Sequence, residues 1–547
     1  MIKADIALAD LAFDPVCHDG SLTLGASTIH PHTHAMLETI VVRGAGRWFV
    51  TVRERASGSR RLAGDRSFHV VDHPGDAEFD SLYRESLLWP LDYVMIEAAR
   101  AGHRLRIRAG LLGSVPVYCQ VIDDRVFLSW DSSDFAARPA MIDLEVASHQ
   151  LALRTMYAAR QLYTGVVLLT ERACMHMEPG RAQFRYPEAI VEHGPAPEDG
   201  EDTLPRFAEA LQRVVALRPW ATGGASLELS GGMDSATVAT ALTRQHGDID
   251  SKGILLDGDV RAPQVRRRGS IVDRLGLSDR TVDIAAYPPT VDLRASHGPL
   301  GFSRDFYIDA CSALWSSARD AGRDVLFTGI GGDELFPAYV GEVADDATMN
   351  PAWGRDARGY AEALLTPQAL NAARSWPVFE APATAVPATA LLAHACRAPD
   401  LLKHGQWPVN PLSDPHLAAF CQRLPRSSRE GREVMRRYLE SHLGPDVFPK
   451  GYLKETFANV LPPLVAKNAP VLTAQLRECA LADLGLVDRD AVLELLATIV
   501  ATRAHPATSA FAAFLWLERC ARQASGRAVS APEVSATSHA ADSLVHG

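Results

Sequence analysis

The segment Ala225-Ser226-Leu227-Glu228-Leu229-Ser230-Gly231-Gly232-Met233-Asp234-Ser235 decides the fold of this chain. Its apolar first half predicts a short strand, and residues 235–243 have the period of an amphipathic helix. The two adjacent glycines allow the turn to approach a ligand closely, because neither carries a Cβ. A turn that opens a helix in this way presents backbone N–H groups to an anion. The segment therefore predicts a phosphate-binding loop after a strand.

Strands and helices alternate downstream of this loop. Residues 253–256 read as a strand, and the helix that follows extends to residue 277. A further helix at 306–321 precedes a strand at 325–327. Such alternation predicts an α/β fold with a parallel sheet covered by helices on both faces. From about residue 360 the pattern becomes helical.

The first part of the chain has a different pattern, made of short alternating strands. Its clearest signal is a hairpin in which residues 41–43 and 47–52 flank Gly44-Ala45-Gly46. A stretch rich in Pro, Gly and acidic residues follows from residue 187 and reads as a linker. We expect a β-rich domain at 1–190, a linker at 191–203, the α/β domain at 204–520 and a disordered tail at 521–547.

Composition narrows the class of protein. The chain has 547 residues, which predicts more than one domain, and its net charge of -11 argues against a nucleic-acid partner. The run Arg266-Arg267-Arg268 has the pattern of a solvated helix face. The eight cysteines are scattered without CxxC spacing, as in proteins of a reducing compartment. No apolar run approaches ~18 residues, so we expect a cytoplasmic protein with no membrane partner.

A second glycine-rich segment, Thr328-Gly329-Ile330-Gly331-Gly332-Asp333, follows the strand at 325–327. Loops at the carboxyl ends of parallel strands meet in one crevice, so Asp333 is expected to lie near Asp234. Two carboxylates beside phosphate-binding loops imply a bridging Mg²⁺. The lysine of the GxxxxGK[ST] loop is absent, which excludes a kinase or GTPase of that class. We expect ATP to be bound by Leu229, Ser230, Gly231, Gly232, Asp234, Ser235, Leu255, Gly329 and Ile330.

The pattern Ser-Gly-Gly-x-Asp-Ser resembles the pyrophosphate-binding loop of the ATP pyrophosphatases. With the second loop and the segments 410–414, 433–443 and 444–457, the chain is similar to the asparagine synthetase family over about residues 100–490. The resemblance implies an ATP-pyrophosphatase domain, of the adenine nucleotide α hydrolase-like fold, after an Ntn-glutaminase-like α+β sandwich. It also implies an AMP-forming ligase in which Lys454 is the catalytic lysine, aimed at the departing pyrophosphate. Lys450 is a rival for that role.

The glutaminase-like domain carries no nucleophile at the expected position. Glutamine-dependent members of the family have a cysteine there, and this chain has Ile2, which cannot attack a substrate. The resemblance therefore implies an inactive domain and an amine that arrives with the substrate. His30, His32 and His34 alternate, but no acid or cysteine at ligand spacing accompanies them, so loop packing is favoured over a metal site.

The residue between the glycines of the second loop bears on the product. Asparagine synthetases resemble one another in having Glu there and β-lactam synthetases have Tyr, whereas this chain has Ile330. The segment looks more like lasso peptide cyclases, which implies macrolactam formation in antibiotic biosynthesis. The implied partners are a precursor peptide and a leader-peptide protease. Glu334 is our candidate proton acceptor.

Three alternatives stay open. The first is a β-lactam synthetase or another small-molecule amide synthetase of the same AMP-forming kind. The second is a catalytically inactive scaffold of the same fold, which the joint presence of Ser230, Asp234, Asp333 and Lys454 opposes. The third is a tRNA-thiolating ATP pyrophosphatase, which the scattered cysteines and the net charge of -11 oppose.

Overall fold

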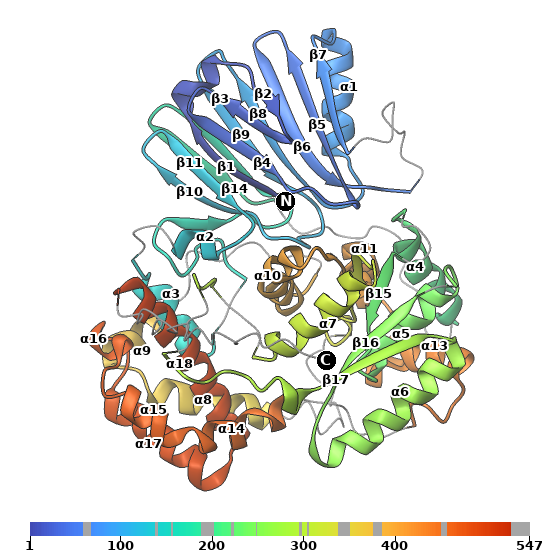
Figure 1. Ribbon diagram of the computed structural model, residues 1–547, viewed down its shortest axis with the longest axis vertical. Helices are drawn as coiled ribbons and strands as arrows, with labels where there is room; N and C mark the ends of the chain where they lie inside the picture. Colours follow the sequence, from blue (N-terminus) through green and yellow to red (C-terminus); the bar gives the residue numbers. More distant parts are fainter. Residues whose placement is uncertain are drawn as a thin grey trace, which may run out of the picture.

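The computed structural model describes residues 1–57, 67–136, 141–154, 157–187, 202–219, 224–247, 249–294, 298–302, 306–336, 351–375, 386–449 and 457–526. Two stacked sheets form one end of the molecule, and a third sheet surrounded by helices forms the other (Figure 1). Among the helices in these ranges, none combines the length and the apolar character that a bilayer crossing requires.

The stacked sheets form a sandwich whose inner faces share one apolar core. Alternate residues of each strand point inward, such as Ile6 and Leu128 from one sheet and Val50 and Ile107 from the other. The side chain of Ile2 is 1% exposed and belongs to this core. The strand orders are β12 (Val166–Leu168), β10 (Tyr118–Ile122), β11 (Arg125–Ser129), β1 (Ile2–Ala7), β4 (Ser27–Pro31), β3 (Ser21–Leu24) and β2 (Val16–His18) in the first sheet, and β14 (Arg181–Arg185), β13 (Cys174–Glu178), β9 (Arg104–Ala109), β8 (Tyr93–Ala99), β6 (Arg47–Glu54), β5 (Leu37–Gly44) and β7 (Phe68–Asp72) in the second.

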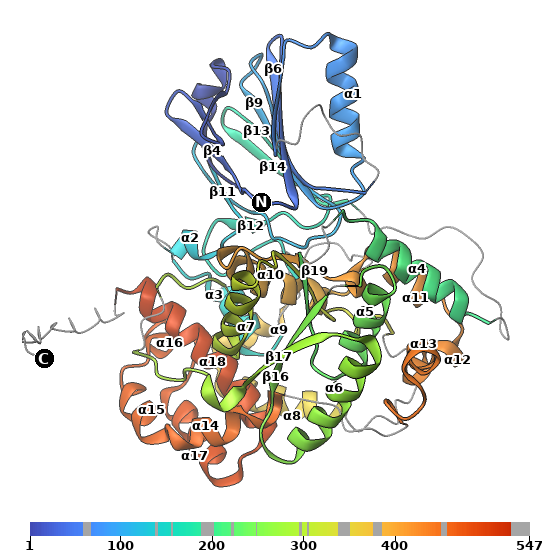
Figure 2. The same cartoon turned by 45° about the vertical axis from the view of Figure 1, so that its right-hand side comes forward.

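Helix α1 (Asp76–Leu87) covers part of the outer face of the second sheet (Figure 2). Phe79 on the helix packs edge-on against Phe49 of β6, with ring centroids 5.3 Å apart. The cluster that contains these two rings also holds Met95 of β8 but no residue of β9, β13 or β14. The outer face of those three strands therefore lies outside the apolar cluster under α1.

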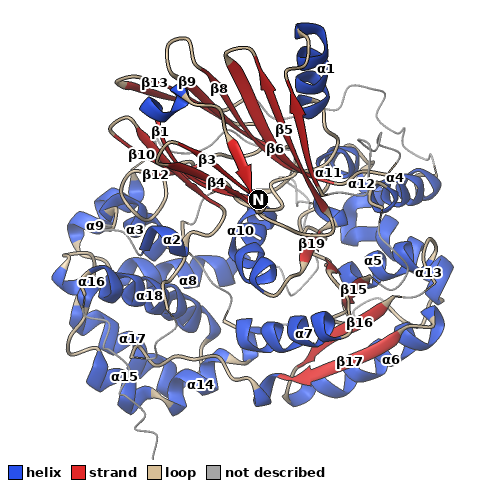
Figure 3. Ribbon diagram, turned by 45° about the horizontal axis from the view of Figure 1, so that its top comes forward, coloured by secondary structure: helices blue, strands red, loops and turns tan. Residues whose placement is uncertain are grey.

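The third sheet is parallel throughout, as the alternation of strands and helices predicted (Figure 3). Helices α4 (Leu204–Ala216), α5 (Met233–Thr243), α6 (Arg261–Leu275) and α13 (Glu433–Leu443) pack around one face, and α7 (Ile308–Asp320) and α10 (Ala388–Lys403) around the other. Leu326 faces the second group and Phe327 the first, so strand β18 is buried on both sides of the sheet. Its order is β17 (Ser278–Asp283), β16 (Asp250–Leu255), β15 (Ala225–Glu228), β18 (Val325–Phe327) and β19 (Trp407–Val409).

The expected boundary at residue 190 does not separate two cores. Helix α3 (Leu144–Leu151) lies within the first 190 residues, yet its apolar face packs against C-terminal helices. The shared cluster includes α8 (Pro351–Ala363), α9 (Pro367–Arg374), α17 (Arg489–Thr502) and α18 (His505–Ala524). Dividing the chain at a change in composition missed the packing of α3 on the C-terminal helices. Helix α3 is too short to bury its apolar residues alone, so it needs these distant partners.

Two other expected boundaries need correction. The tail was expected from residue 521, but α18 continues to Ala524, because Ala521 and Arg522 are buried. Residues 527–547 lie outside the described residues. Residues 191–201 of the expected linker also lie outside them, and Thr203 at its end is fully buried and hydrogen-bonded to Ser428 at 2.9 Å.

A buried ion pair joins the sandwich to the parallel sheet. Glu54 of β6 has no exposed surface and accepts hydrogen bonds from Arg218 at 2.5 and 3.2 Å. Trp407 of β19 donates its Nε1–H to the same carboxylate at 2.8 Å. Because a buried carboxylate must be fully hydrogen-bonded to be tolerated, these contacts fix one geometry between the two parts.

We expect Glu171→Gln to stabilise the protein at alkaline pH. Burial raises the pKa of Glu171 from 4.5 to about 7, although Tyr157 donates a hydrogen bond to its carboxylate. A raised pKa in the folded state means that stability is fully present below the unfolded value and is lost as the pH rises through about 7. The gain at pH above that value is on the order of 1–3 kcal/mol. Urea denaturation below pH 4.5 and above pH 7 measures this difference in the free energy of unfolding between the variant and the unmodified protein.

The control is Glu209→Gln, since the Glu209 side chain is 70% exposed. This variant is expected to show the same pH dependence as the unmodified protein. An equal change in the two variants would rule out a burial effect at Glu171.

Candidate active site

The first loop joins β15 to α5 and is held by its own hydroxyls. Gly231 has φ +97°, a conformation that favours glycine. The Ser230 N–H donates to Ser235 Oγ at 3.2 Å, and the Gly232 N–H donates to Ser230 Oγ at 3.1 Å. Gly232 caps α5 without any side-chain acceptor for the first-turn N–H groups. The first-turn N–H groups of α5 are therefore available to bind an anion at the helix N-terminus.

Two side chains of α6 hold this loop from behind, and sequence reasoning missed both. Gln264 donates to the Ser230 carbonyl at 3.0 Å and accepts the Leu256 N–H at 2.9 Å. Arg267 donates to the Gly231 carbonyl at 2.7 Å. The run at 266–268 was expected to be a solvated helix face, but Arg267 and Arg268 are buried. The physical reason is that the buried guanidinium of Arg267 donates to the Gly231 carbonyl and that of Arg268 donates to Asp279.

The second loop packs tightly against the first, as the topology predicted. A Cβ at Gly332 would lie 2.3 Å from Asp234 Cγ, and one at Gly329 would lie 2.7 Å from Ser235 N. Gly331 has φ +98°, and a Cβ there would lie 2.8 Å from the Leu412 backbone. All three glycines are therefore required by close backbone approach.

Asp234 and Asp333 converge on a single guanidinium, that of Arg432. Arg432 Nη1 lies 2.8 Å from Asp234 Oδ1, and its Nη2 binds Asp333 Oδ1. Arg432 has φ +57° and immediately precedes α13. Carboxylates close enough to share one cation fit the expected Mg²⁺ site, because two oxygen ligands leave room for phosphate oxygens and water. The sequence contains no pattern that singles out Arg432.

Removing this guanidinium is expected to tighten the binding of divalent metal. Arg432→Ala withdraws a competing positive charge from Asp234 and Asp333, so Mn²⁺, used in place of Mg²⁺, is expected to bind about tenfold more tightly without nucleotide. Titration followed by Mn²⁺ electron paramagnetic resonance measures the affinity. Arg274→Ala is the control, because Arg274 forms a comparable pair with exposed Asp446 at 2.8 and 3.0 Å. Unchanged Mn²⁺ affinity in Arg432→Ala would contradict a shared cation site.

The two loops open into a cavity of about 320 Å³ at the carboxyl ends of β15, β16 and β18. One wall carries Glu228, which accepts hydrogen bonds from Arg397 at 2.6 Å and from Trp315 Nε1 at 2.8 Å. Tyr307 and Phe457 line another part and stack with ring centroids 4.0 Å apart. The cavity thus combines a phosphate-binding side with aromatic and charged walls.

Most of the expected ATP-binding residues line this cavity. They are Leu229, Ser230, Gly232, Asp234, Ser235, Gly329, Ile330 and the expected metal ligand Asp333. Gly231, Leu255 and Glu334 are not among the lining residues; Ile254 and Leu256 flank Leu255 and take its place. The role of Glu334 stays a prediction, and Lys454 and Lys450 lie outside the described residues.

Glycine loops at the carboxyl ends of parallel strands, with paired carboxylates beside them, are the site of an ATP-using enzyme. Residues 206–390 match the family model of asparagine synthase, which supports membership of the asparagine synthetase family and C–N ligase chemistry. Enzymes of this family use ATP, usually with Mg²⁺.

No curated protein matches the chain. Among solved structures, the U34-tRNA thiolase NcsA from Methanococcus maripaludis, determined with its 4Fe–4S cluster, is 14% identical. The alignment covers 49% of this chain and 94% of that chain with a TM-score of 0.21.

Proposed function

We propose that this protein is a lasso peptide macrolactam synthetase, an AMP-forming ligase that closes a precursor peptide into a ring. The observation that carries the proposal is Ile330, which lines the cavity between the two loops. Its side chain packs against an apolar cluster, and an isoleucine at this position can neither bind nor deprotonate a free amine. An amine that belongs to the same molecule as the carboxylate needs less help from the wall, because closure is intramolecular.

The first step is adenylation of an Asp or Glu side chain of the peptide. A carboxylate oxygen attacks the α-phosphorus of ATP, and pyrophosphate leaves. The N–H groups at the start of α5 and the hydroxyls of Ser230 and Ser235 would bind the departing phosphates. Mg²⁺, held by Asp234 and Asp333, would neutralise phosphate charge when bound. Phe457, three residues beyond Lys454 in the sequence, lines the cavity, which supports Lys454 as a further cation for pyrophosphate.

The second step is attack of the peptide's α-amine on the acyl carbon, with AMP as the leaving group. The isopeptide bond replaces one carboxyl oxygen, so the peptide loses the elements of one water. An α-amine with a pKa of about 7.7–8.0 is partly neutral at physiological pH and needs only a weak proton acceptor. Glu334 is our proposed acceptor. A leader-peptide protease is the proposed partner that frees this amine.

The test is mass spectrometry of candidate precursor peptides incubated with the enzyme, ATP and Mg²⁺. We expect a peptide product lighter by one water, with AMP and pyrophosphate formed in equal amounts. AMP formation with small β-amino acids but with no peptide would replace the proposal by a small-molecule amide synthetase. No AMP with either class of substrate would favour an inactive scaffold.

A further inference from the structure

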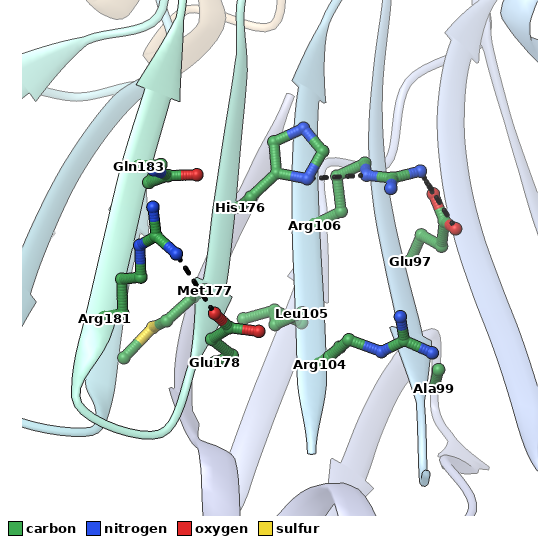
Figure 4. A pocket seen from close by; sticks show the side chains of 10 residues that line it. All are labelled: Glu97, Ala99, Arg104, Leu105, Arg106, His176, Met177, Glu178, Arg181 and Gln183. Atoms are coloured by element: carbon green, nitrogen blue, oxygen red, sulfur yellow. Dashed lines mark hydrogen bonds and ion pairs between the residues drawn. The ribbon is translucent and has the colours of Figure 1, made fainter. Parts of the chain in front are cut away.

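The outer face of β9, β13 and β14, beyond the edge of α1, carries a group of arginine side chains. The inward-facing residues of these strands, such as Ile107, Met175 and Phe184, pack in the sandwich core. The alternate residues therefore point outward and form a hollow of about 310 Å³ (Figure 4). We call this surface the arginine face; its charged and titratable members are Glu97, Arg104, Arg106, Arg108, His176, Glu178, Arg181 and Arg185.

The arginine face is strongly basic in an acidic protein. Five arginines stand against two glutamates, which leaves three positive charges on one face of a chain whose net charge is -11. His176 adds no charge at neutral pH, because burial and neighbouring Arg106 lower its pKa. Like charges on neighbouring strands destabilise a sheet unless something compensates them. This concentration of arginine points to a negatively charged partner.

Among the described residues, carboxylates balance only part of the positive charge of the arginine face. Arg106 lies 3.1 and 3.3 Å from the Glu97 oxygens and donates to His176 Nδ1 at 3.1 Å. Arg181 is 3.8 Å from Glu178 and its side chain is 62% exposed. In the described part of the chain, no carboxylate lies within ion-pair distance of Arg104, which is exposed. Arg104 donates its Nε–H to the Ala101 carbonyl at 3.3 Å, which leaves its two terminal nitrogens for a carboxylate ligand.

We propose that the arginine face docks an acidic polypeptide segment of a partner protein. Guanidinium groups pair with carboxylates through two parallel hydrogen bonds, and the hollow has room for side chains of an extended peptide. β14 is the last strand of its sheet among the described residues, so its outer edge can accept a further strand beside the hollow. Glu97 and Glu178, interspersed among the arginines, would repel the continuous phosphates of a nucleic acid.

The proposal is independent of the nucleotide site and is tested by binding alone. The probe is a short fluorescein-labelled peptide of alternating aspartate and serine, titrated with the full-length protein at low salt and followed by anisotropy. The comparison probes are an asparagine–serine peptide and single-stranded oligothymidylate. We expect only the aspartate peptide to bind, and added salt to weaken it.

The deciding variant is Arg104→Ala with Arg181→Ala. We expect it to weaken peptide binding by about tenfold, and the corresponding double lysine variant to restore part of the affinity. Arg213→Ala with Arg489→Ala removes the same charge from side chains that are 72% and 43% exposed elsewhere, and should leave binding unchanged. Equal weakening in this control would overturn the proposal, as would tighter, Arg104-dependent binding of oligothymidylate. Failure of the aspartate peptide to bind at all would also overturn it.

Discussion

Asp234→Asn is expected to lower the rate of AMP formation by about a hundred- to a thousandfold. The substitution keeps the shape of the side chain and removes its charge. Asp234 faces the cavity beside the N-terminus of α5 and shares the guanidinium of Arg432 with Asp333. Under the proposed function, removing this charge would leave Asp333 as the one anionic Mg²⁺ ligand of the pair, and the phosphate charge that grows in adenylation would be less well neutralised. Release of AMP from radiolabelled ATP measures the rate.

The matched control is Asp446→Asn, which breaks an exposed Asp–Arg pair with Arg274, and neither residue is among the described residues that line the cavity. Its rate is expected to equal that of the unmodified protein. Calorimetric titration of ATP, with and without Mg²⁺, shows whether the Asp234 carboxylate acts on ATP binding through Mg²⁺ or independently of it. If Asp234→Asn kept a full rate and a full Mg²⁺ dependence, Asp234 would not be a metal ligand.

Gly332→Ala is expected to reduce AMP formation by about a hundredfold and to destabilise the fold by about 1–3 kcal/mol. The new methyl group would lie 2.3 Å from Asp234 Cγ and 2.5 Å from Asp234 Cβ, so the carboxylate has to move. A displacement of about 1 Å at a reacting site is enough for a loss of this size. Thermal denaturation and the AMP assay together measure both effects.

Gly359→Ala makes the same chemical change where nothing lies within 4 Å of the added methyl group. Gly359 is inside α8, so alanine is expected to stabilise the protein by about 0.5–1 kcal/mol and to leave AMP formation unchanged. A Gly332→Ala variant that behaved like this control would mean that the two loops are not held together at that point.

The sequence was sufficient to predict the elements whose residues have a clear period. The hairpin of β5 and β6, the strand β15, the helix α5 and the parallel character of the sheet around them follow from apolar alternation, from the alternation of strands with helices and from glycine at the turns. β17 was missed because five of its six residues are exposed, so it has no apolar signal. β19 is only three residues long and lies in a region whose surroundings are helical.

The sequence predicted those site residues that carry a suitable chemical group and follow a strand in the chain. Ser230, Asp234 and Asp333 are adjacent to strands, and the rule that parallel strands end at one edge was enough to bring them together. Arg432 and Arg397 come from segments far along the chain, and only tertiary packing brings them to the cavity. Arg267 was misread because a basic run on a helix is usually solvated.

The packing of α3 against the C-terminal helices has a consequence for biosynthesis. During translation, the apolar face of α3 leaves the ribosome hundreds of residues before α18, which covers it. The amino-terminal half therefore cannot complete its fold while the chain is still being made, unlike domains that form one after another. Such delayed, long-range closure slows folding and leaves hydrophobic surface exposed to aggregation. A nascent chain of this protein is thus expected to depend on chaperones until α18 has been synthesised.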